Sequence, residues 1–218
     1  MRHVLDISLL KNNRQYALLF IGQFISYIGI MITSVALPWQ IYQLTRSTFM
    51  VGMLSLVQLV PLLITALLGG VFADRYNRLK LVMISESVLM ASCGALLVNA
   101  QLTHTNVSLI YVIAAIMSAI TGLHRPALES MTQQLVYPSH YKAVGALSGF
   151  KYSFCMIVGP AIGGMLIAQC GIWITYLINL GTFLISIIAL WNMKPLQQKT
   201  KSEHPPVLLD RQSYKNYI

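Results

Sequence analysis

The sequence predicts an all-α membrane protein with six transmembrane helices. Of its 218 residues, 56% are hydrophobic and only 10% are charged, whereas an ordinary soluble domain carries roughly 25% charged residues. The hydrophobic residues also gather in runs of the length that a helix needs to cross a bilayer, about 20 residues. Composition and run length together argue against a soluble globular domain, as does the mean hydropathy of +0.65.

Short polar or charged breaks separate the runs. The first run carries no charged residue between Arg14 and Arg46 and would form a helix of about 43 Å, enough to span a bilayer with some tilt. After the second run, a basic loop from Asp74 to Lys80 ends one helix and starts the next. The expected spans are residues 16-44, 49-73, 81-100, 107-136, 143-169 and 172-193.

These spans make a transmembrane domain over residues 16-193. Residues 1-15 form an N-terminal segment that we do not expect to be a cleaved signal peptide, because the apolar run after it is too long and no small-residue cleavage site closes it. Residues 194-218 are rich in Lys, Gln, Ser, Glu and Pro, so we expect a polar, disordered tail.

The positions of lysine and arginine predict the orientation. With six spans, twelve of the 15 basic residues fall in segments on one side and only Arg46 falls on the other, while Arg125 and Lys151 lie inside spans. The positive-inside rule then places both termini in the cytoplasm. The net charge of +9 becomes a topology signal, so the expected surroundings are the lipid bilayer and no nucleic acid.

Four ionisable side chains lie inside the spans, where a charge costs several kcal/mol unless it faces protein or water. Lys151 is about ten residues into the fifth span and so near the membrane midplane. It should face a cavity or pair with an acid, and a functional role is favoured over a structural one. Glu86 in the third span fits a structural ion pair and a proton-linked role equally. Arg125 and Glu129 are four residues apart near the end of the fourth span, which favours an intrahelical ion pair at the interface.

Polar residues also follow one face of the first span. Gln23, Tyr27 and Ser34 are spaced by four and seven residues. Such a stripe can line a polar cavity or make hydrogen bonds to other helices, and the two interpretations are compatible.

A group of small residues marks the fifth span. Gly159, Gly163 and Gly164 would allow another helix to approach closely, and Pro160 frees a carbonyl group and permits a bend. We interpret this segment as a packing and hinge element of the kind that a rocking transporter uses. A kink without any motion is the alternative.

The sequence contains little that points to an enzyme. No H-E-x-x-H, G-x-S-x-G, G-x-G-x-x-G or P-loop motif occurs. The three cysteines form no C-x-x-C pair, so neither a metal site nor a cofactor is expected. A ligand role for His124, a lone histidine near a helix end, is a minor alternative.

The loop after the second span carries a family resemblance. Gly70, Asp74, Arg75 and Arg78 resemble the loop motif G-x-x-x-D-R-x-G-R-[RK] of the major facilitator superfamily. Asn77 replaces the second glycine, and because Asn tolerates a left-handed turn, we expect the loop geometry to survive. The resemblance implies a gating role for this loop, as a latch between two halves of a transporter.

Further segments resemble the exporters of that superfamily. Gly159, Pro160, Gly163 and Gly164 resemble the end of its antiporter motif, whose earlier glycines would fall at Ala146 and Cys155. Segments 24-26, 35-41, 47-52 and 203-206 resemble the enterobactin (siderophore) exporter branch. The resemblance implies an inner-membrane exporter of small amphiphilic molecules, such as siderophores or drugs, that works by alternating access. It also implies proton coupling, for which Glu86 is the best-placed acid.

The resemblance covers only the N-terminal half of that fold. A complete transporter of the superfamily has two six-helix halves, each a 3+3 inverted repeat. Either two copies dimerise, or a partner supplies the second half, or the chain is a truncated and non-transporting membrane protein. We favour truncation, because the tail departs from the resemblance after Pro206 and starts no new span.

Overall fold

The computed structural model describes residues 8–193, so residues 1–7 and the expected tail at 194–218 lie outside the described part. Within it, six helices are long and apolar enough to cross a membrane, which confirms the predicted all-α fold. They are α2 (Arg14–Thr45), α3 (Thr48–Arg75), α4 (Arg78–Gln101), α5 (Val107–Leu135), α6 (Tyr141–Cys170) and α7 (Ile172–Trp191).

The helix ends lie within three residues of the expected ones, and capping explains much of the difference. Asn13, Ser47, Asn77 and Asn106 each accept a hydrogen bond from a backbone N–H in the first turn of the helix that follows. The caps therefore bring polar and basic residues, such as Arg14 and Arg78, into the helices. Two short elements were not expected: α1 (Ser8–Asn12) and the 3₁₀ helix η1 (Pro138–His140).

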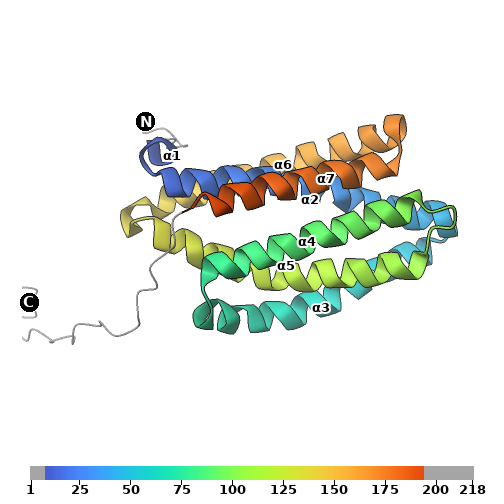
Figure 1. The fold of residues 1–218 in the computed structure, drawn as a ribbon, viewed down its shortest axis with the longest axis horizontal. Helices are drawn as coiled ribbons and strands as arrows, with labels where there is room; N and C mark the ends of the chain where they lie inside the picture. Colours follow the sequence, from blue (N-terminus) through green and yellow to red (C-terminus); the bar gives the residue numbers. More distant parts are fainter. Residues whose placement is uncertain (1–7, 194–218) are drawn as a thin grey trace, which may run out of the picture.

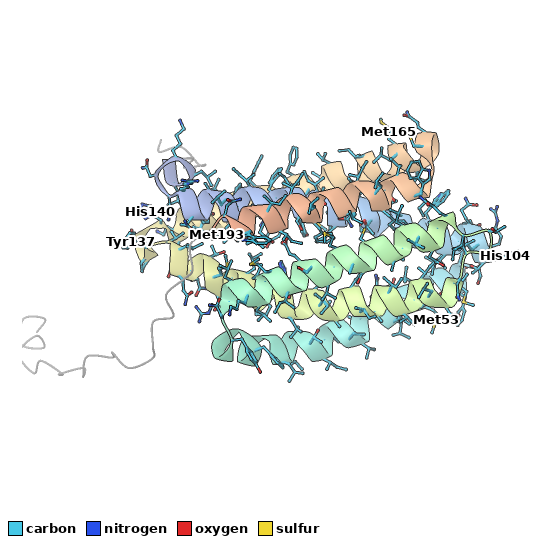
Figure 2. The ribbon with its side chains drawn as sticks, viewed as in Figure 1. Met53, His104, Tyr137, His140, Met165 and Met193 are labelled. Atoms are coloured by element: carbon cyan, nitrogen blue, oxygen red, sulfur yellow. The ribbon has the colours of Figure 1, made fainter. Side chains whose placement is uncertain are left out.

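The helices run the length of an elongated bundle. Figure 2 places Tyr137, His140 and Met193 at one end, here called the Met193 end, and His104 at the other, the His104 end. The six long helices form two sequence triplets, α2–α4 and α5–α7. The α2 helix starts at the Met193 end and α5, the equivalent helix of the second triplet, starts at the His104 end. Equivalent helices of the two triplets therefore run in opposite directions.

Two groups of three helices make up the bundle (Figure 1). In one group α5 lies between α3 and α4, and in the other α2 lies between α6 and α7, while α4 and α7 join the groups. By their contacts, neighbouring helices follow the order α3, α5, α4, α7, α2, α6. Exchanging α2 with α5, α3 with α6 and α4 with α7 reverses this order. This is the symmetry of a 3+3 inverted repeat in which the first helix of each triplet packs with the last two helices of the other.

Close approach of α6 to α2 fixes the second group. The buried residues of α6 are spaced by four, and they form one face. On this face a Cβ atom added at Gly163 would lie 2.9 Å from the carbonyl oxygen of Ile32, and one at Gly159 would collide with Met31. In a bilayer such packing replaces the hydrophobic effect as the force that joins helices. Gly171, with φ +86°, then makes the tight link from α6 to α7.

We expect Gly163→Ala to lower the apparent Tm of the detergent-solubilised chain by several degrees. The new methyl group must push α6 away from the Ile32 carbonyl, and overpacking of this kind costs about 1–3 kcal/mol. Gly164→Ala is the matched control, because a Cβ there meets nothing within 4 Å. Equal shifts in the two variants, measured by thermal unfolding, would show that the α2–α6 approach does not limit stability.

Candidate functional site

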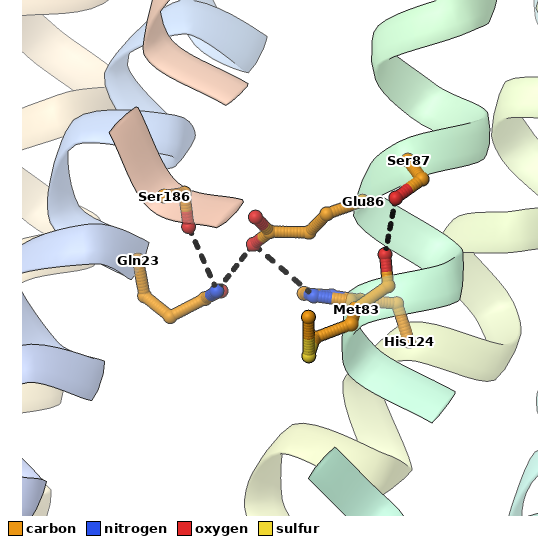
Figure 3. Close-up of polar contacts among 6 residues, drawn as sticks. All are labelled: Gln23, Met83, Glu86, Ser87, His124 and Ser186. Atoms are coloured by element: carbon orange, nitrogen blue, oxygen red, sulfur yellow. Dashed lines mark hydrogen bonds and ion pairs between the residues drawn. The ribbon is translucent and has the colours of Figure 1, made fainter. Parts of the chain in front are cut away.

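Four polar side chains meet in the interior of the bundle, where four helices cross. Glu86 on α4 is at the centre, and Gln23 on α2, His124 on α5 and Ser186 on α7 surround it (Figure 3). All four are buried, Glu86 and Ser186 completely. Both three-helix groups therefore contribute side chains to the surroundings of one carboxyl group.

These contacts engage one carboxyl oxygen and leave the other open. Nε2 of Gln23 donates a hydrogen bond to Oε1 of Glu86 and lies 3.5 Å from Oγ of Ser186. Nε2 of His124 is 3.7 Å from the same Oε1, which is too long for a hydrogen bond but short enough for an ion pair with a protonated imidazole. Among the described residues, Oε2 of Glu86 and Nε2 of His124 have no hydrogen-bond partner.

This arrangement places a carboxyl group and an imidazole side by side in the interior of the bundle. A carboxylate buried in a membrane domain costs several kcal/mol unless a proton or a cation neutralises it. Oε2 of Glu86 can take up a proton without displacing Gln23, and a proton on His124 would place a cation beside the carboxylate. The electrostatic energy at the junction of the two helix groups therefore depends on protonation.

A cavity of about 190 Å³ lies beside this cluster, between α2, α5 and α6. Gln23 lines the cavity and also binds Glu86, so it connects the two. Lys151 from α6 and Glu129 from α5 contribute opposite charges to the same cavity.

Lys151 is buried, with 5% of its surface exposed. Its Nζ atom lies 4.6 Å from the ring centroid of Tyr152 and 5.9 Å from that of Phe20. No carboxylate within the described part of the chain lies within ion-pair distance of it. Of the two expected surroundings, the structure therefore places Lys151 at a cavity and not beside an acid, while its functional role stays a prediction.

The expected ion pair between Arg125 and Glu129 is wrong. Both side chains are exposed, and over residues 8–193 the structure contains no ion pair between them. Exposed charges gain little from pairing, because solvent screens their attraction.

The polar stripe on the first span divides among different surroundings. Gln23 reaches Glu86, whereas Tyr27 packs edge to face on Tyr152, with ring centroids 5.0 Å apart. Ser34 lines a second cavity of about 340 Å³ between α2, α3, α4 and α5, together with Ser55, Gln58 and Thr121. Both interpretations of the stripe, cavity lining and interhelical bonding, thus apply to parts of it.

The loop between α3 and α4 is described in part. The side chains of Asp74 and Arg75 lie outside the described residues, although their backbone belongs to α3. Nη1 of Arg78 donates to the carbonyl oxygen of Ser130 on α5, at 3.3 Å. A Cβ atom at Gly70 would meet nothing within 4 Å.

The expectation that Asn77 supports a left-handed turn is wrong. Its φ is −63° and its ψ is 115°, and its side chain accepts a hydrogen bond from the backbone N–H of Lys80. At the position where the motif has a glycine, Asn77 is the N-cap of α4. Of the described residues other than glycine, only Arg46 has a positive φ.

Pro160 lies within an α6 that runs unbroken to Cys170. Gly159 and Gly163 face α2, whereas Gly164 faces open space. The contacts therefore fit the interpretation of this motif as a packing element, and its interpretation as a hinge stays a prediction.

The sequence interpretation missed His124 and Ser186 as neighbours of Glu86. One signal was present for His124: Glu86 is 15 residues before the end of α4 at Gln101, and His124 is 17 residues after the start of α5 at Val107. In an antiparallel pair of helices these residues lie at similar depth. No comparable signal marks Ser186, which lies far along the chain in the apolar helix α7.

Comparison with known proteins gives a match over nearly the whole chain. A family model described as a transmembrane secretion effector, MFS_3, matches residues 9–208. The chain is 30% identical over 205 residues to the enterobactin exporter EntS of Shigella flexneri, which covers 93% of the chain and 50% of that protein. The EntS proteins of Shigella boydii serotype 18 and of Escherichia coli O1:K1 match at the same identity, over 49% of their length.

The chain thus spans about half the length of the curated relatives it matches. No solved structure matches it. Both the family and these relatives are transporters and not enzymes. The chain belongs to the transmembrane secretion effector family of the major facilitator superfamily, as a multi-pass membrane protein that matches the N-terminal half of an exporter.

Proposed function

We propose that the chain forms one half of an exporter of small amphiphilic molecules, such as siderophores or drugs, that works by alternating access with proton coupling. The observation that carries this proposal is the complete burial of the Glu86 carboxyl group where four spanning helices cross. Intramembrane ionisable residues of this kind mark transport pathways and proton relays.

Protonation of Glu86 would change the balance between two arrangements of the helices. The ionised carboxyl group favours an arrangement in which Gln23 and a protonated His124 stay close to it. The neutral group loses most of that preference, so α2 and α5 are free to separate. A shift of about 5.5 kcal/mol takes a two-state equilibrium from 1:99 to 99:1, and a buried charge supplies energies of that order.

Completion of the transport pathway would need a second six-helix half, since the chain spans about half the length of its relatives. Ser34 and Ser55 are exposed polar residues at the 340 Å³ cavity. Polar groups at membrane depth are found facing protein or a water-filled cavity, and not lipid. The most apolar part of α3 is only 6% buried, so this helix has free surface for such a half.

We also propose that the six helices span the inner membrane and that both termini face the cytoplasm, as the positive-inside rule predicts. The loop of Asp74, Arg75 and Arg78 would then lie on the cytoplasmic face. The bond from Arg78 to Ser130 ties it to the end of α5 within this half, and its role as a latch between halves rests on the motif resemblance.

We expect the purified chain to move an amphiphile in liposomes under an imposed proton gradient when a second half is available. A catecholate siderophore and a fluorescent amphiphile are the probes, and the mass of the chain in detergent shows whether two copies associate. Transport by a dimer would show that two copies rebuild the pathway. A folded monomer that transports only with a partner half identifies a subunit, and one that transports under neither condition contradicts the proposal.

We expect Glu86→Gln to reduce proton-driven efflux by roughly tenfold or more, which equals about 1.4 kcal/mol in the rate-limiting barrier. The amide keeps the shape of the side chain and an oxygen that can accept from Gln23, but it cannot be ionised. Ser87→Ala is the control, because Ser87 is exposed and donates only to its own helix, at the Met83 carbonyl. Efflux by the Gln variant that stays at the parent rate and still follows the proton gradient would exclude Glu86 as the coupling group.

We expect Asp74→Asn to abolish most efflux in the reconstituted pair of halves, because the amide removes the negative charge from the expected latch. Lys80→Gln serves as its control, since Lys80 is exposed, lies one position beyond the motif and also changes the charge of the same loop by one. Unchanged efflux in the Asn variant, measured in the same liposomes, would count against a gating role of the loop.

A further inference from the structure

The 190 Å³ cavity between α2, α5 and α6 is lined by polar groups that the Glu86 cluster does not use. Lys151 and Tyr16 line it from two different helices, and 5% and 2% of their surfaces are exposed. Burying a charge or a hydroxyl group is costly unless it is paired.

The ammonium group of Lys151 is the first of these groups. Its contacts in the described structure are with the faces of Tyr152 and Phe20. Such contacts stabilise a cation but leave its hydrogen-bond donors unused. An anion at Nζ would satisfy the charge and the donors together.

The hydroxyl group of Tyr16 is the second. It is buried and, within the described part, has no hydrogen-bond partner. A phenol can donate one hydrogen bond, and buried tyrosine hydroxyls usually find such a partner. The oxygen of this hydroxyl group has no accessible surface, however, so Lys151 is the donor that a ligand in the cavity can reach.

The size and the walls of the cavity restrict that ligand. A cavity of about 150 Å³ holds one benzene molecule, so 190 Å³ has room for one ring with one small substituent. Phe20 and Tyr152 line it and provide aromatic surfaces against which a ring can pack.

We propose that this cavity binds a single aromatic ring that carries an anionic group, such as an aromatic carboxylate. The anionic oxygen accepts hydrogen bonds from Nζ of Lys151, and the ring packs on Phe20 and Tyr152. Glu129, which is exposed and lines the same cavity, repels the anion as it enters. The inference rests on the proposed function only in that the ring would be part of the transported molecule.

The test is equilibrium binding of benzoate to the full chain in detergent, measured by ligand-observed NMR. Benzyl alcohol, benzylamine and inorganic phosphate are the comparison ligands, matched to a neutral ring, a cationic ring and an anion without a ring. We expect benzoate to bind at least roughly tenfold more tightly than each of them, because only benzoate satisfies both the charge and the aromatic walls.

Substitutions assign the binding to this cavity. Lys151→Met keeps the volume and removes the charge, and should weaken benzoate binding roughly tenfold or more, whereas Lys151→Arg should retain it. Tyr16→Phe should leave it unchanged, because the hydroxyl group is closed off from the cavity, and Glu129→Gln should strengthen it. Lys142→Met is the control for charge on the same helix, because Lys142 is exposed and does not line the cavity.

Three results would overturn the inference: equal binding of benzoate and benzyl alcohol, equal binding of benzoate and phosphate, or equal loss in the Lys151→Met and Lys142→Met variants. Gel filtration of each variant shows whether it is folded, and retention of binding by Lys151→Arg separates loss of charge from loss of structure. Because binding needs neither a gradient nor a second half, a chain that binds benzoate but never transports would contradict the proposed function and leave this inference intact. A chain that transports but does not bind benzoate would do the reverse.

Discussion

Close packing of α2 against two other helices is the interaction on which the rest of the structure depends. Lipid and leucine are equally apolar, so the hydrophobic effect cannot pull two spanning helices together. On one side α2 meets the small residues of α6. On the other side it bonds to α7 through Thr33 and Asn179, with 2.6 Å between Oγ1 and Nδ2, and through Gln40 and Tyr176, with 2.6 Å between Oε1 and the hydroxyl oxygen. This position brings Gln23 to Glu86 and Tyr16 to the cavity of Lys151.

The two contacts of α2 differ in kind. The α7 side is joined by directional hydrogen bonds between buried groups. The α6 side is joined by close packing of Gly159 and Gly163 on α2 and by ring contacts such as Tyr27 on Tyr152. Among the described residues, Sγ of Cys155 makes a long contact to the Phe24 carbonyl there, at 3.9 Å.

The sequence was sufficient for the helices because their ends are marked locally. Charges and polar caps such as Asn13 and Asn106 stop and start each run, and the bilayer fixes its length. It was sufficient also to single out Glu86 and Lys151, since an ionisable group in an apolar run stands out without any knowledge of its neighbours. The depth of Lys151 left two surroundings open, a cavity or an acid, and the structure places it at a cavity.

The contacts of these groups could not be predicted in the same way. Helical spacing shows which residues share a face, but not which helix that face meets. His124 and Ser186 therefore remained unconnected to Glu86. The Arg125–Glu129 pair failed for a related reason: a spacing of four permits an ion pair, but exposure to solvent removes most of its advantage. Asn77 showed that one residue can preserve a motif by another mechanism, here by capping a helix where glycine would permit a turn.

The packing of the first helix of each triplet with the other triplet has a consequence for the insertion of the protein into the membrane during synthesis. Each helix is stable in the bilayer by itself, because its backbone groups bond internally, but the partners of α2 are α6 and α7, and the main partner of α3 is α5. During synthesis the first three helices enter the membrane before any of these partners exist. The carboxyl group of Glu86 then lies beside lipid or water until α5, which carries His124, and α7, which carries Ser186, have been inserted. Of the six long helices described, α7 is therefore the one that completes the bundle.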